Sequence, residues 1–308
     1  PNEVSVRVLK RMVHPIDSLL IRGIVPMPID PEGSAPGTDG VGIVEEVGSG
    51  VDPSTGLVAG ARVIIFHAHG TWSERILADA ETLIPIPDDI DDATASQLSI
   101  NGITAIMLMR AATAADNQAG ITSPLLVTAA GAAVARNVLA LARMRGMKAV
   151  ALVRSASGAA ILAEVFNDVP IVSMEREDWP ATVVQAGGVA PSVAIDPIGG
   201  EMAPKLLALL ADGGTLLTYG GLDPRPSQIS TIAMTIHHQT IKGVTAPTWL
   251  TTTSPEQRRR DISDLFEIAR QAPRNFGEYE EFDLQDVVEA IAATQATPRR
   301  MASILVSK

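Results

Sequence analysis

The spacing of apolar residues divides the chain into two parts with different rhythms. Through about residue 100, short alternating or continuous apolar runs are separated by turns rich in Gly, Pro and Asp. Runs of this kind predict β-strands. The predicted strands are Val4–Leu9, Val41–Val47, Ala61–Phe66 and Trp72–Leu77. Their close spacing is typical of a small β-barrel.

From about residue 102, apolar runs alternate with helical patterns. Helices are predicted near 132–145, 156–166, 178–187 and 200–211. The runs lack polar alternation, which indicates parallel strands buried on both faces. Strands that alternate with helices predict βαβ units and a doubly wound sheet. The predicted strands are Leu125–Thr128, Lys148–Val153, Val169–Ser173, Ser192–Asp196, Thr215–Tyr219 and Thr240–Val244.

The alternation ends after about residue 246. A charged helix, Glu256–Gln271, is followed by a strand at Glu278–Phe282, a helix at Leu284–Thr294 that Asp283 caps, and a last strand at Met301–Val306. This tail is too small to fold alone, so we expect it to complete the first domain. The predicted domains are therefore 1–104 together with 246–308, and 105–245.

Composition excludes several classes of function. The 308 residues contain no cysteine, which rules out disulfides, cysteine nucleophiles and thiolate zinc sites. The net charge of −11 disfavours binding to nucleic acid. No apolar stretch of about 20 residues is present, so we expect no membrane span. No secretory signal is visible, and we expect a cytoplasmic protein that acts on a small molecule.

The turn after the first predicted parallel strand is rich in small residues. At this place in a doubly wound sheet, backbone N–H groups at a helix start bind a pyrophosphate. Only one glycine is present, so the turn is not a strict G-x-G-x-x-G, and plain helix packing is an alternative interpretation. The candidate cofactor-binding residues are Ala130, Gly131, Ala132, Ala133 and Val134.

The second predicted strand ends in Arg154 and Ser155 without an acidic residue before Glu164. An acid at this point would take the ribose hydroxyls of NAD, whereas Arg154 would pair with a 2′-phosphate. A solvated arginine is the alternative. The missing acid favours NADPH over NADH. Tyr219, Gly220 and Gly221 follow a later strand and are further cofactor candidates, although tight turns use the same glycines.

Several short motifs occur in a familiar order and spacing. They are His14-Pro15-Ile16-Asp17, Pro36-Gly37-Thr38-Asp39-Gly40-Val41-Gly42-Ile43-Val44, Gly60-Ala61-Arg62-Val63, Gly70-Thr71-Trp72, Ile100 to Ala105, Asp196 to Gly200, and Thr218 to Gly221. Together they resemble the zinc-independent medium-chain dehydrogenase/reductase superfamily, in its trans-2-enoyl-CoA reductase and quinone oxidoreductase branch. The resemblance extends over essentially the whole chain.

The resemblance implies an α/β fold with a GroES-like β-barrel domain and a Rossmann domain that binds NADPH. It implies reduction of an activated alkene or quinone by hydride transfer, without zinc, in a homodimer formed through Rossmann edge strands. Asn101 and Thr104 would act near the nicotinamide, and Thr104 would also bind the cofactor. Tyr219 and Gly220 would flank the cofactor, and Trp249 would line the substrate cleft or pack between domains.

The sequence departs from this family at several positions. The proton-donating tyrosine of the family's G-x-Y-P segment is Val25 here, which would only line the substrate site. His14 replaces an asparagine and is a candidate proton source, with a buried structural role as the alternative. Ala133 and Ala135 replace glycines of the phosphate turn. An NADPH-binding sensor or a degenerate enzyme with little activity is therefore a second hypothesis.

A metal site is not expected. His67 and His69 alternate along a predicted strand, which would place both rings on one face. The zinc enzymes of this superfamily use cysteine ligands, however, and this chain has none.

Overall fold

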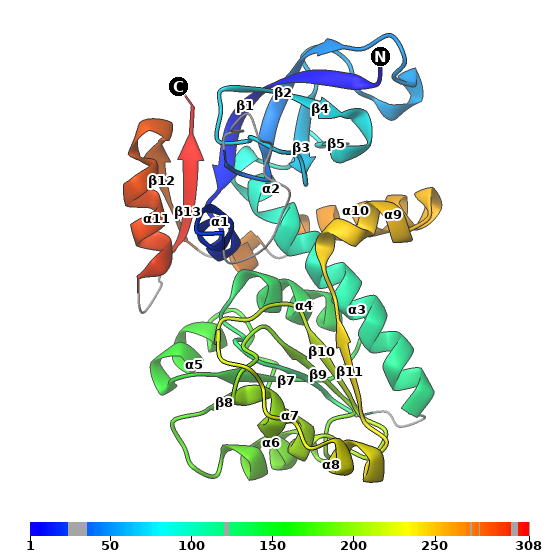
Figure 1. Ribbon diagram of the computed structural model, residues 1–308, viewed down its shortest axis with the longest axis vertical. Coiled ribbons are helices and arrows are strands. Elements are labelled where there is room, and N and C mark those ends of the chain that lie inside the picture. Colours follow the sequence, from blue (N-terminus) through cyan, green and yellow to red (C-terminus); the bar gives the residue numbers. More distant parts are fainter. Residues whose placement is uncertain (24–35, 120–122, 272, 277, 297–300, 308) are drawn as a thin grey trace. The chain divides into compact units, whose positions relative to one another are not determined.

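The computed structural model describes residues 1–23, 36–119, 123–271, 273–276, 278–296 and 301–307. The chain forms two compact units. Unit 1 comprises Pro1–Ile100, Leu250–Thr253 and Ala269–Lys308, and unit 2 comprises Asn101–Trp249 and Ser254–Ile268. A mixed sheet in unit 1 and a parallel sheet in unit 2 confirm the predicted α/β class (Figure 1).

Unit 1 is built around one mixed sheet whose strand order is β12-β13-β1-β2-β3-β5. The long β1 pairs antiparallel with β2, β13 and β4, and the edge pair β12–β13 is parallel. The strands are β1 (Glu3–Met12), β2 (Asp39–Val47), β3 (Arg62–Phe66), β4 (Arg75–Asp79), β5 (Leu83–Pro85), β12 (Tyr279–Asp283) and β13 (Ala302–Val306). The strand predicted at Trp72–Leu77 begins later, at Arg75, because Trp72 belongs to a turn.

Alternation along β1 builds the core of unit 1. Val4, Val6 and Val8 are fully buried, whereas Ser5 and Arg7 between them are only partly covered. The three valines pack with apolar residues of β2, β3 and β4. Unit 1 also contains the helices α1 (Pro15–Ile21), α2 (Asp92–Leu98) and α11 (Val287–Gln295).

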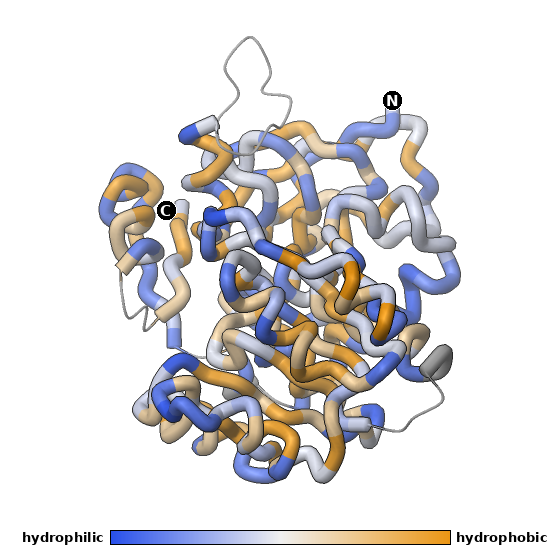
Figure 2. Tube along the Cα trace, turned by 60° about the horizontal axis from the view of Figure 1, so that its bottom comes forward, coloured by the Kyte–Doolittle hydropathy of each residue, from blue (hydrophilic) through white to orange (hydrophobic). Residues whose placement is uncertain are grey.

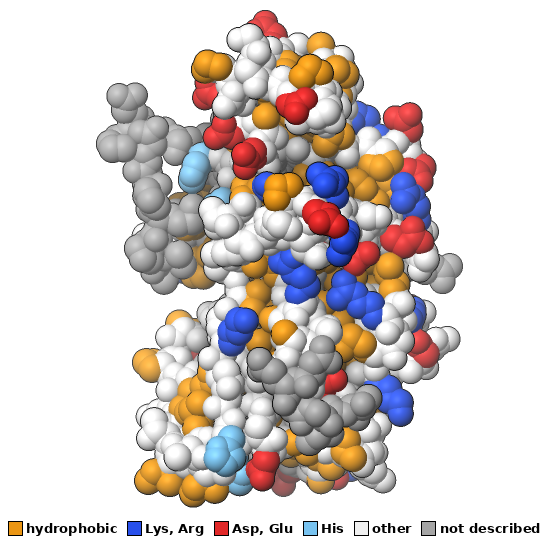
Figure 3. Space-filling view, turned by 90° about the vertical axis from the view of Figure 1, so that its right-hand side faces the viewer, with side chains coloured by type: hydrophobic (Ala, Val, Ile, Leu, Met, Phe, Trp, Pro, Cys, Tyr) orange, Lys and Arg blue, Asp and Glu red, His pale blue; other side chains and the backbone are white. Residues whose placement is uncertain are grey.

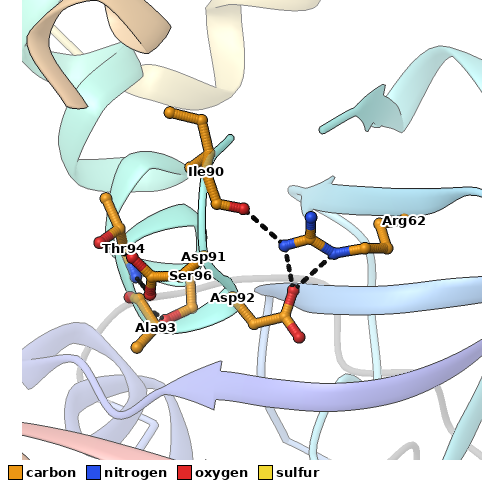
Figure 4. A network of polar contacts seen from close by, with 7 residues as sticks. All are labelled: Arg62, Ile90, Asp91, Asp92, Ala93, Thr94 and Ser96. Carbon is orange, nitrogen blue, oxygen red and sulfur yellow. Dashed lines mark hydrogen bonds and ion pairs between the residues drawn. The ribbon is translucent and has the colours of Figure 1, made fainter. Parts of the chain in front are cut away.

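A polar network holds the start of α2 (Figure 4). The Arg62 guanidinium donates to the Asp92 carboxylate at 3.0 and 2.6 Å and to the Ile90 carbonyl at 2.7 Å. The Asp91 carboxylate accepts from the Thr94 backbone N–H at 2.9 Å and so caps the helix.

Unit 2 contains a six-stranded, fully parallel sheet with the order β11-β10-β9-β6-β7-β8. The chain runs outward from β6 in both directions, so the strand order reverses beside β6. Ligands of such sheets bind where the strands end at this point. The strands are β6 (Leu125–Val127), β7 (Ala149–Val153), β8 (Ile171–Ser173), β9 (Val193–Asp196), β10 (Thr215–Thr218) and β11 (Thr240–Gly243).

Helices flank this sheet and supply the rest of the core of unit 2 (Figures 1 and 2). In α4, apolar residues at helical spacing, including Ala135, Val138 and Leu141, are fully buried. The helices that carry residues of unit 2 are α3 (Ile100–Ala119), α4 (Ala133–Met144), α5 (Ala156–Ala163), α6 (Trp179–Gly187), α7 (Met202–Leu209), α8 (Thr231–Ile236), α9 (Trp249–Thr252) and α10 (Pro255–Gln271).

Most of α10 belongs to unit 2, whereas the sequence pattern predicted it in the first domain. The cause is close packing on α3. A Cβ atom on Gly102 would lie 2.6 Å from the Leu265 Cδ2 atom, so a larger residue there would displace the leucine side chain. Arg110 of α3 also pairs with Asp261 of α10 at 3.1 Å.

Surface charges of both signs are interspersed on the face that Figure 3 shows. Ion pairs also occur at the surface of unit 2, such as Arg145 with Asp264 at 2.8 Å. Within the described parts of the chain, no single helix is long and apolar enough to cross a membrane. Two consecutive helices, Asp92–Leu98 and Ile100–Asp116, reach that length and composition only when they are counted together.

Candidate functional site

The predicted cofactor residues of unit 2 lie at one edge of the parallel sheet. Ala130 follows β6, Arg154 follows β7, and Tyr219 follows β10. Because these strands are parallel members of one sheet, their carboxyl ends meet at the same edge. The structure therefore brings together the three segments that the sequence selected separately.

The turn between β6 and α4 is held by backbone hydrogen bonds. The Ala130 N–H donates to the Leu152 carbonyl at 3.1 Å, and the Ala132 N–H donates to the Ala129 carbonyl at 2.8 Å. Ala129 has φ 46°, a left-handed conformation that is costly for a residue other than glycine. This conformation turns the chain sharply from the strand into the helix.

Backbone donors at the start of α4 have no acceptor within the helix. The first intrahelical bond runs from the Arg136 N–H to the Ala132 carbonyl at 2.9 Å, so the N–H groups of Ala133, Val134 and Ala135 precede the helical ladder. Ala132, the N-cap residue, supplies no side-chain acceptor. The positive end of the helix dipole lies here too, which favours an anion.

The space in front of this turn is open. Gly131 is exposed, and a Cβ atom built on it would meet nothing within 4 Å. Ala135 is fully buried, so its methyl group packs into unit 2 rather than over the turn. Ala133 is half-buried. The residues present therefore fit a pyrophosphate.

The end of β7 presents a cation close to a carboxylate. Arg154 is exposed and, among the described residues, makes no hydrogen bond or ion pair. Ser155 is the N-cap of α5, and its hydroxyl accepts from the Gly158 N–H at 3.1 Å. The next donor, the Ala156 N–H, is taken by the Glu175 carboxylate at 3.0 Å. A 2′-phosphate bound at the start of α5 would be attracted by the positive charge of Arg154 and repelled by the negative charge of Glu175.

The ends of β9 and β10 carry a buried polar cluster. Asp196 is 1% exposed and accepts from the Thr128 hydroxyl and from the Gly199 N–H, the latter at 2.8 Å. Burial raises the pKa of Asp196. The Tyr219 hydroxyl is buried without a hydrogen-bond partner among the described residues. Burial, with Asp196 as a second cause, raises the pKa of Tyr219, so the phenol stays protonated.

Beside this cluster, Gly220 and Gly221 are exposed in the turn that follows β10. A Cβ atom on Gly220 would lie 3.0 Å from the Pro197 carbonyl oxygen, which requires a small residue there. Gly221 faces open space. Both glycines stay cofactor-binding predictions, because their backbone is open to a ligand.

Asn101 and Thr104 lie in the first turns of α3 and are 8% and 6% exposed. Their proposed roles near a nicotinamide stay predictions.

Trp249 is only 1% exposed, and its indole N–H donates to the Asp261 carboxylate at 2.7 Å. This buried hydrogen bond disagrees with the expected substrate contact and gives Trp249 a structural task within unit 2. Val25, the other expected substrate residue, lies outside the described residues.

His14 of unit 1 belongs to a buried cluster with two carboxylates. Its Nε2 atom lies 2.9 Å from Asp39, and its backbone N–H donates to Asp17 at 2.6 Å. All three residues are at most 6% exposed. The second carboxylate oxygens of Asp17 and Asp39 have no hydrogen-bond partner within the described ranges. Burial raises the pKa of Asp17 to about 6, so this carboxyl group titrates well above the range of an exposed one.

The two histidines that suggested zinc are not on a strand. They follow β3, and His67 has φ 56°, which breaks the alternation that would have aligned the rings. Burial lowers the pKa of His67, with His69 as a second cause. The described residues hold no group of three side chains suited to a metal ion.

Comparison with known proteins agrees with this architecture. A model of the alcohol dehydrogenase GroES-like domain matches residues 1–88. A mitochondrial enoyl-[acyl-carrier-protein] reductase of Dictyostelium discoideum is 29% identical over 276 residues, which cover 87% of this chain and 76% of the relative.

Solved structures extend the likeness to both units. A Bacillus thuringiensis protein described as an NADPH:quinone reductase has a TM-score of 0.84 and 26% identity, over 100% of this chain and 91% of that chain. The chain belongs to the zinc-independent medium-chain dehydrogenase/reductase superfamily. The Escherichia coli quinone oxidoreductase, solved with NADPH, shares the fold of this medium-chain reductase, with a TM-score of 0.82 at 20% identity over 99% and 91% of the two chains.

The family prediction and the prediction of an enzyme of the medium-chain reductase type are thereby confirmed. Sequence reasoning missed Glu175 in this medium-chain reductase. It follows β8, and only the pairing of β7 with β8 brings it to the start of α5. The sequence signal for Glu175 is an acidic residue just past the third parallel strand, β8, whereas the prediction for the 2′-phosphate rested on residues after the second strand, β7.

Proposed function

We propose that this chain is an NADPH-dependent, zinc-independent oxidoreductase that reduces an activated alkene or a quinone. The observation that carries the proposal is the open turn at Gly131, where the backbone donors that precede the hydrogen bonds of α4 lie at the point of strand reversal. The curated relatives are named enoyl-[acyl-carrier-protein] reductases, and one structural relative is described as an NADPH:quinone reductase. Both substrates contain a double bond conjugated to a carbonyl.

Each part of the chain has a separate task in this proposal. The turn from Ala130 to Val134 would hold the pyrophosphate, and Arg154 with Ser155 would hold the 2′-phosphate. When bound there, NADPH would supply the hydride for the β-carbon of the alkene and would leave as NADP⁺. The chain must then hold a proton for the α-carbon, and must bind the substrate carbonyl as negative charge develops on it.

His14 is the candidate source of that proton, because Val25 has no proton to donate. Its Nε2 atom lies 2.9 Å from the Asp39 carboxylate, which can orient the ring for proton donation. General acid catalysis of this kind contributes about 10²–10⁴-fold to a rate.

The choice of NADPH is tested by Arg154→Ala. Loss of a charge-assisted contact with the 2′-phosphate would weaken NADPH roughly tenfold, while NADH, which lacks that phosphate, keeps its affinity. Lys148→Ala is the matched control, because this exposed cation precedes β7 at the opposite edge of the sheet. Equal losses for both dinucleotides would refute the role of Arg154.

Catalysis is tested by titrating the protein with NADPH and then adding 2-alkenals, crotonyl-CoA or quinones. Oxidation of the bound NADPH supports the reductase. Binding without oxidation by any acceptor would instead support the alternative, an NADPH-binding sensor or degenerate enzyme, which the substitution of Val25 for the family's tyrosine favours.

We further propose that the protein is a cytoplasmic homodimer. Strand β11 pairs with β10 on one side, and its other side ends the sheet as described. The nearby helix α8 exposes Ile232 (72%) and Ile236 (64%). Exposed apolar residues beside a sheet edge are typical of an interface. Light scattering after size exclusion tests the stoichiometry, and a monomer at micromolar concentration would refute it.

A further inference from the structure

A cavity of about 490 Å³ lies at the edge of the parallel sheet of unit 2 where the strands begin. Its walls come from the end of α4, the start of β7, the segment before β8 and the end of α6. A cavity of this size can hold a small organic molecule. The proposed NADPH site is at the opposite edge of the sheet. Because β7 has five residues, about 16 Å separate the two edges, so the cavity is a distinct place.

The wall of this cavity is largely apolar. Apart from two glycines and three charged residues, every residue that lines it is apolar. The larger apolar side chains are Pro124, Leu139, Met147, Val150, Val169 and Pro170. A hydrocarbon group placed against them is stabilised, because apolar surface leaves water on both sides of the contact.

Two of the three charged residues neutralise each other. The Arg143 guanidinium donates to the Asp168 carboxylate through two nitrogens, Nε at 2.9 Å and Nη2. Arg143 also lies over the Phe166 ring, 5.0 Å from its centroid. The third charged residue, Lys148, is exposed, and its ammonium group has no hydrogen bond or ion pair among the described residues. The cavity therefore presents one positive charge that no carboxylate balances.

The end of α4 does not balance that charge either. Carbonyl groups at a helix C-terminus attract cations when they have no other donor. Here the carbonyls of Leu141, Ala142 and Arg143 accept from the backbone N–H groups of residues 145–147, at 2.9 to 3.1 Å. They are engaged, so the charge of Lys148 is available to an anion.

We propose that this cavity binds a small amphipathic anion. The apolar body of the ligand packs against the walls from α4 and β7, and its anionic group pairs with Lys148. A medium-chain carboxylate has this chemistry. The site is separate from the proposed reductase chemistry and does not depend on it.

The first test is a titration with octanoate, followed by NMR of protein labelled at its methionine methyl groups. Met147 lines the cavity, whereas Met174 follows β8 at the opposite edge of the sheet. Octanoate should shift the Met147 signal and leave the Met174 signal unchanged. Acetate lacks the apolar body and should cause no shift at the same concentration. Octanol lacks the charge and should bind about fivefold more weakly than octanoate.

Two variants locate the site. Ala186→Phe places a ring in the cavity from an exposed position near the end of α6, and it should weaken octanoate at least about tenfold by excluding part of the chain. Ala208→Phe is the matched control, because Ala208 is also exposed and is also the next-to-last residue of a helix, α7. Lys148→Met removes the charge but keeps an apolar stem. It should weaken octanoate about fivefold and leave octanol unchanged.

Several results would overturn this proposal. They are no shift of Met147 at millimolar octanoate, equal losses in Ala186→Phe and Ala208→Phe, and equal losses of octanoate and octanol in Lys148→Met. Displacement of octanoate by NADPH would also overturn it, because the ligand would then occupy the other edge of the sheet. If Ala186→Phe did not fold, exposed Lys148→Met would decide alone. A protein that bound octanoate but no NADPH would refute the proposed function and leave this site standing.

Discussion

Asn in place of Asp17 should make the protein more stable at neutral pH. Asp17 is 2% exposed and lies beside His14 and Asp39. Burial, the largest cause, raises its pKa from 3.8 to about 6 in the folded chain. The folded state therefore binds the proton more tightly than the unfolded state. Folding stability attributable to this group falls as pH rises from about 4 to about 6, and the loss is complete above that window.

The size of this effect follows from the pKa difference. A shift from 3.8 to about 6 corresponds to about 3 kcal/mol of unfolding free energy at pH 7. Asn stays neutral at every pH, and its side-chain oxygen can still accept from the His14 N–H. The stability of Asp17→Asn minus that of the parent protein should therefore increase by about 2.4 kcal/mol between pH 4 and pH 7, because part of the effect already appears below pH 4.

Urea unfolding followed by circular dichroism at several pH values measures this difference. Comparing variant and parent at the same pH cancels the contributions of all other titrating groups. Asp88→Asn, an exposed carboxylate elsewhere in unit 1, is the control and should give a flat difference. A flat difference for Asp17→Asn would show that the carboxylate is not held protonated. If the stability of Asp17→Asn minus that of the parent fell as the pH rose, the reasoning would be refuted, because the cluster would then stabilise the Asp17 carboxylate anion.

Two further predictions concern unit 2. Glu175→Gln should strengthen NADPH binding roughly two- to fivefold at low salt without changing NADH binding, because it removes a charge beside the 2′-phosphate site. Fluorescence titration measures this, exposed Glu177→Gln is the control, and equal gains for both dinucleotides would contradict it. Trp249→Phe should lower the unfolding free energy by about 2–3 kcal/mol, because Asp261 loses a buried donor. Unchanged stability in urea, with weaker substrate binding instead, would return Trp249 to the substrate cleft.

The periodicity of apolar residues predicted the parallel strands almost residue by residue. The interior of a doubly wound sheet needs continuous apolar runs, and those runs are local in the sequence. The prediction was weaker where packing between distant segments determines the structure. The sequence pattern assigned the charged helix α10 to the first domain. In the structure it packs on α3, where Leu265 lies close to Gly102.

The candidate site divides in the same way. The turn after β6 could be found from sequence, because a strand, a run of small residues and a helix follow one another directly. The cluster of His14, Asp17 and Asp39 could be found only in part, since its two motifs are separated along the chain and meet through the antiparallel pairing of β1 and β2. Spacing alone does not say that a histidine will face a carboxylate.

The two ends of the predicted dinucleotide site therefore differ in whether their polar groups already have hydrogen-bond partners without a ligand. At the adenosine end, Glu175 already occupies a helix donor near Arg154, so a 2′-phosphate must compete with an internal carboxylate. At the other end, the buried Tyr219 hydroxyl has no hydrogen-bond partner among the described residues. The first arrangement limits affinity and makes it depend on ionic strength.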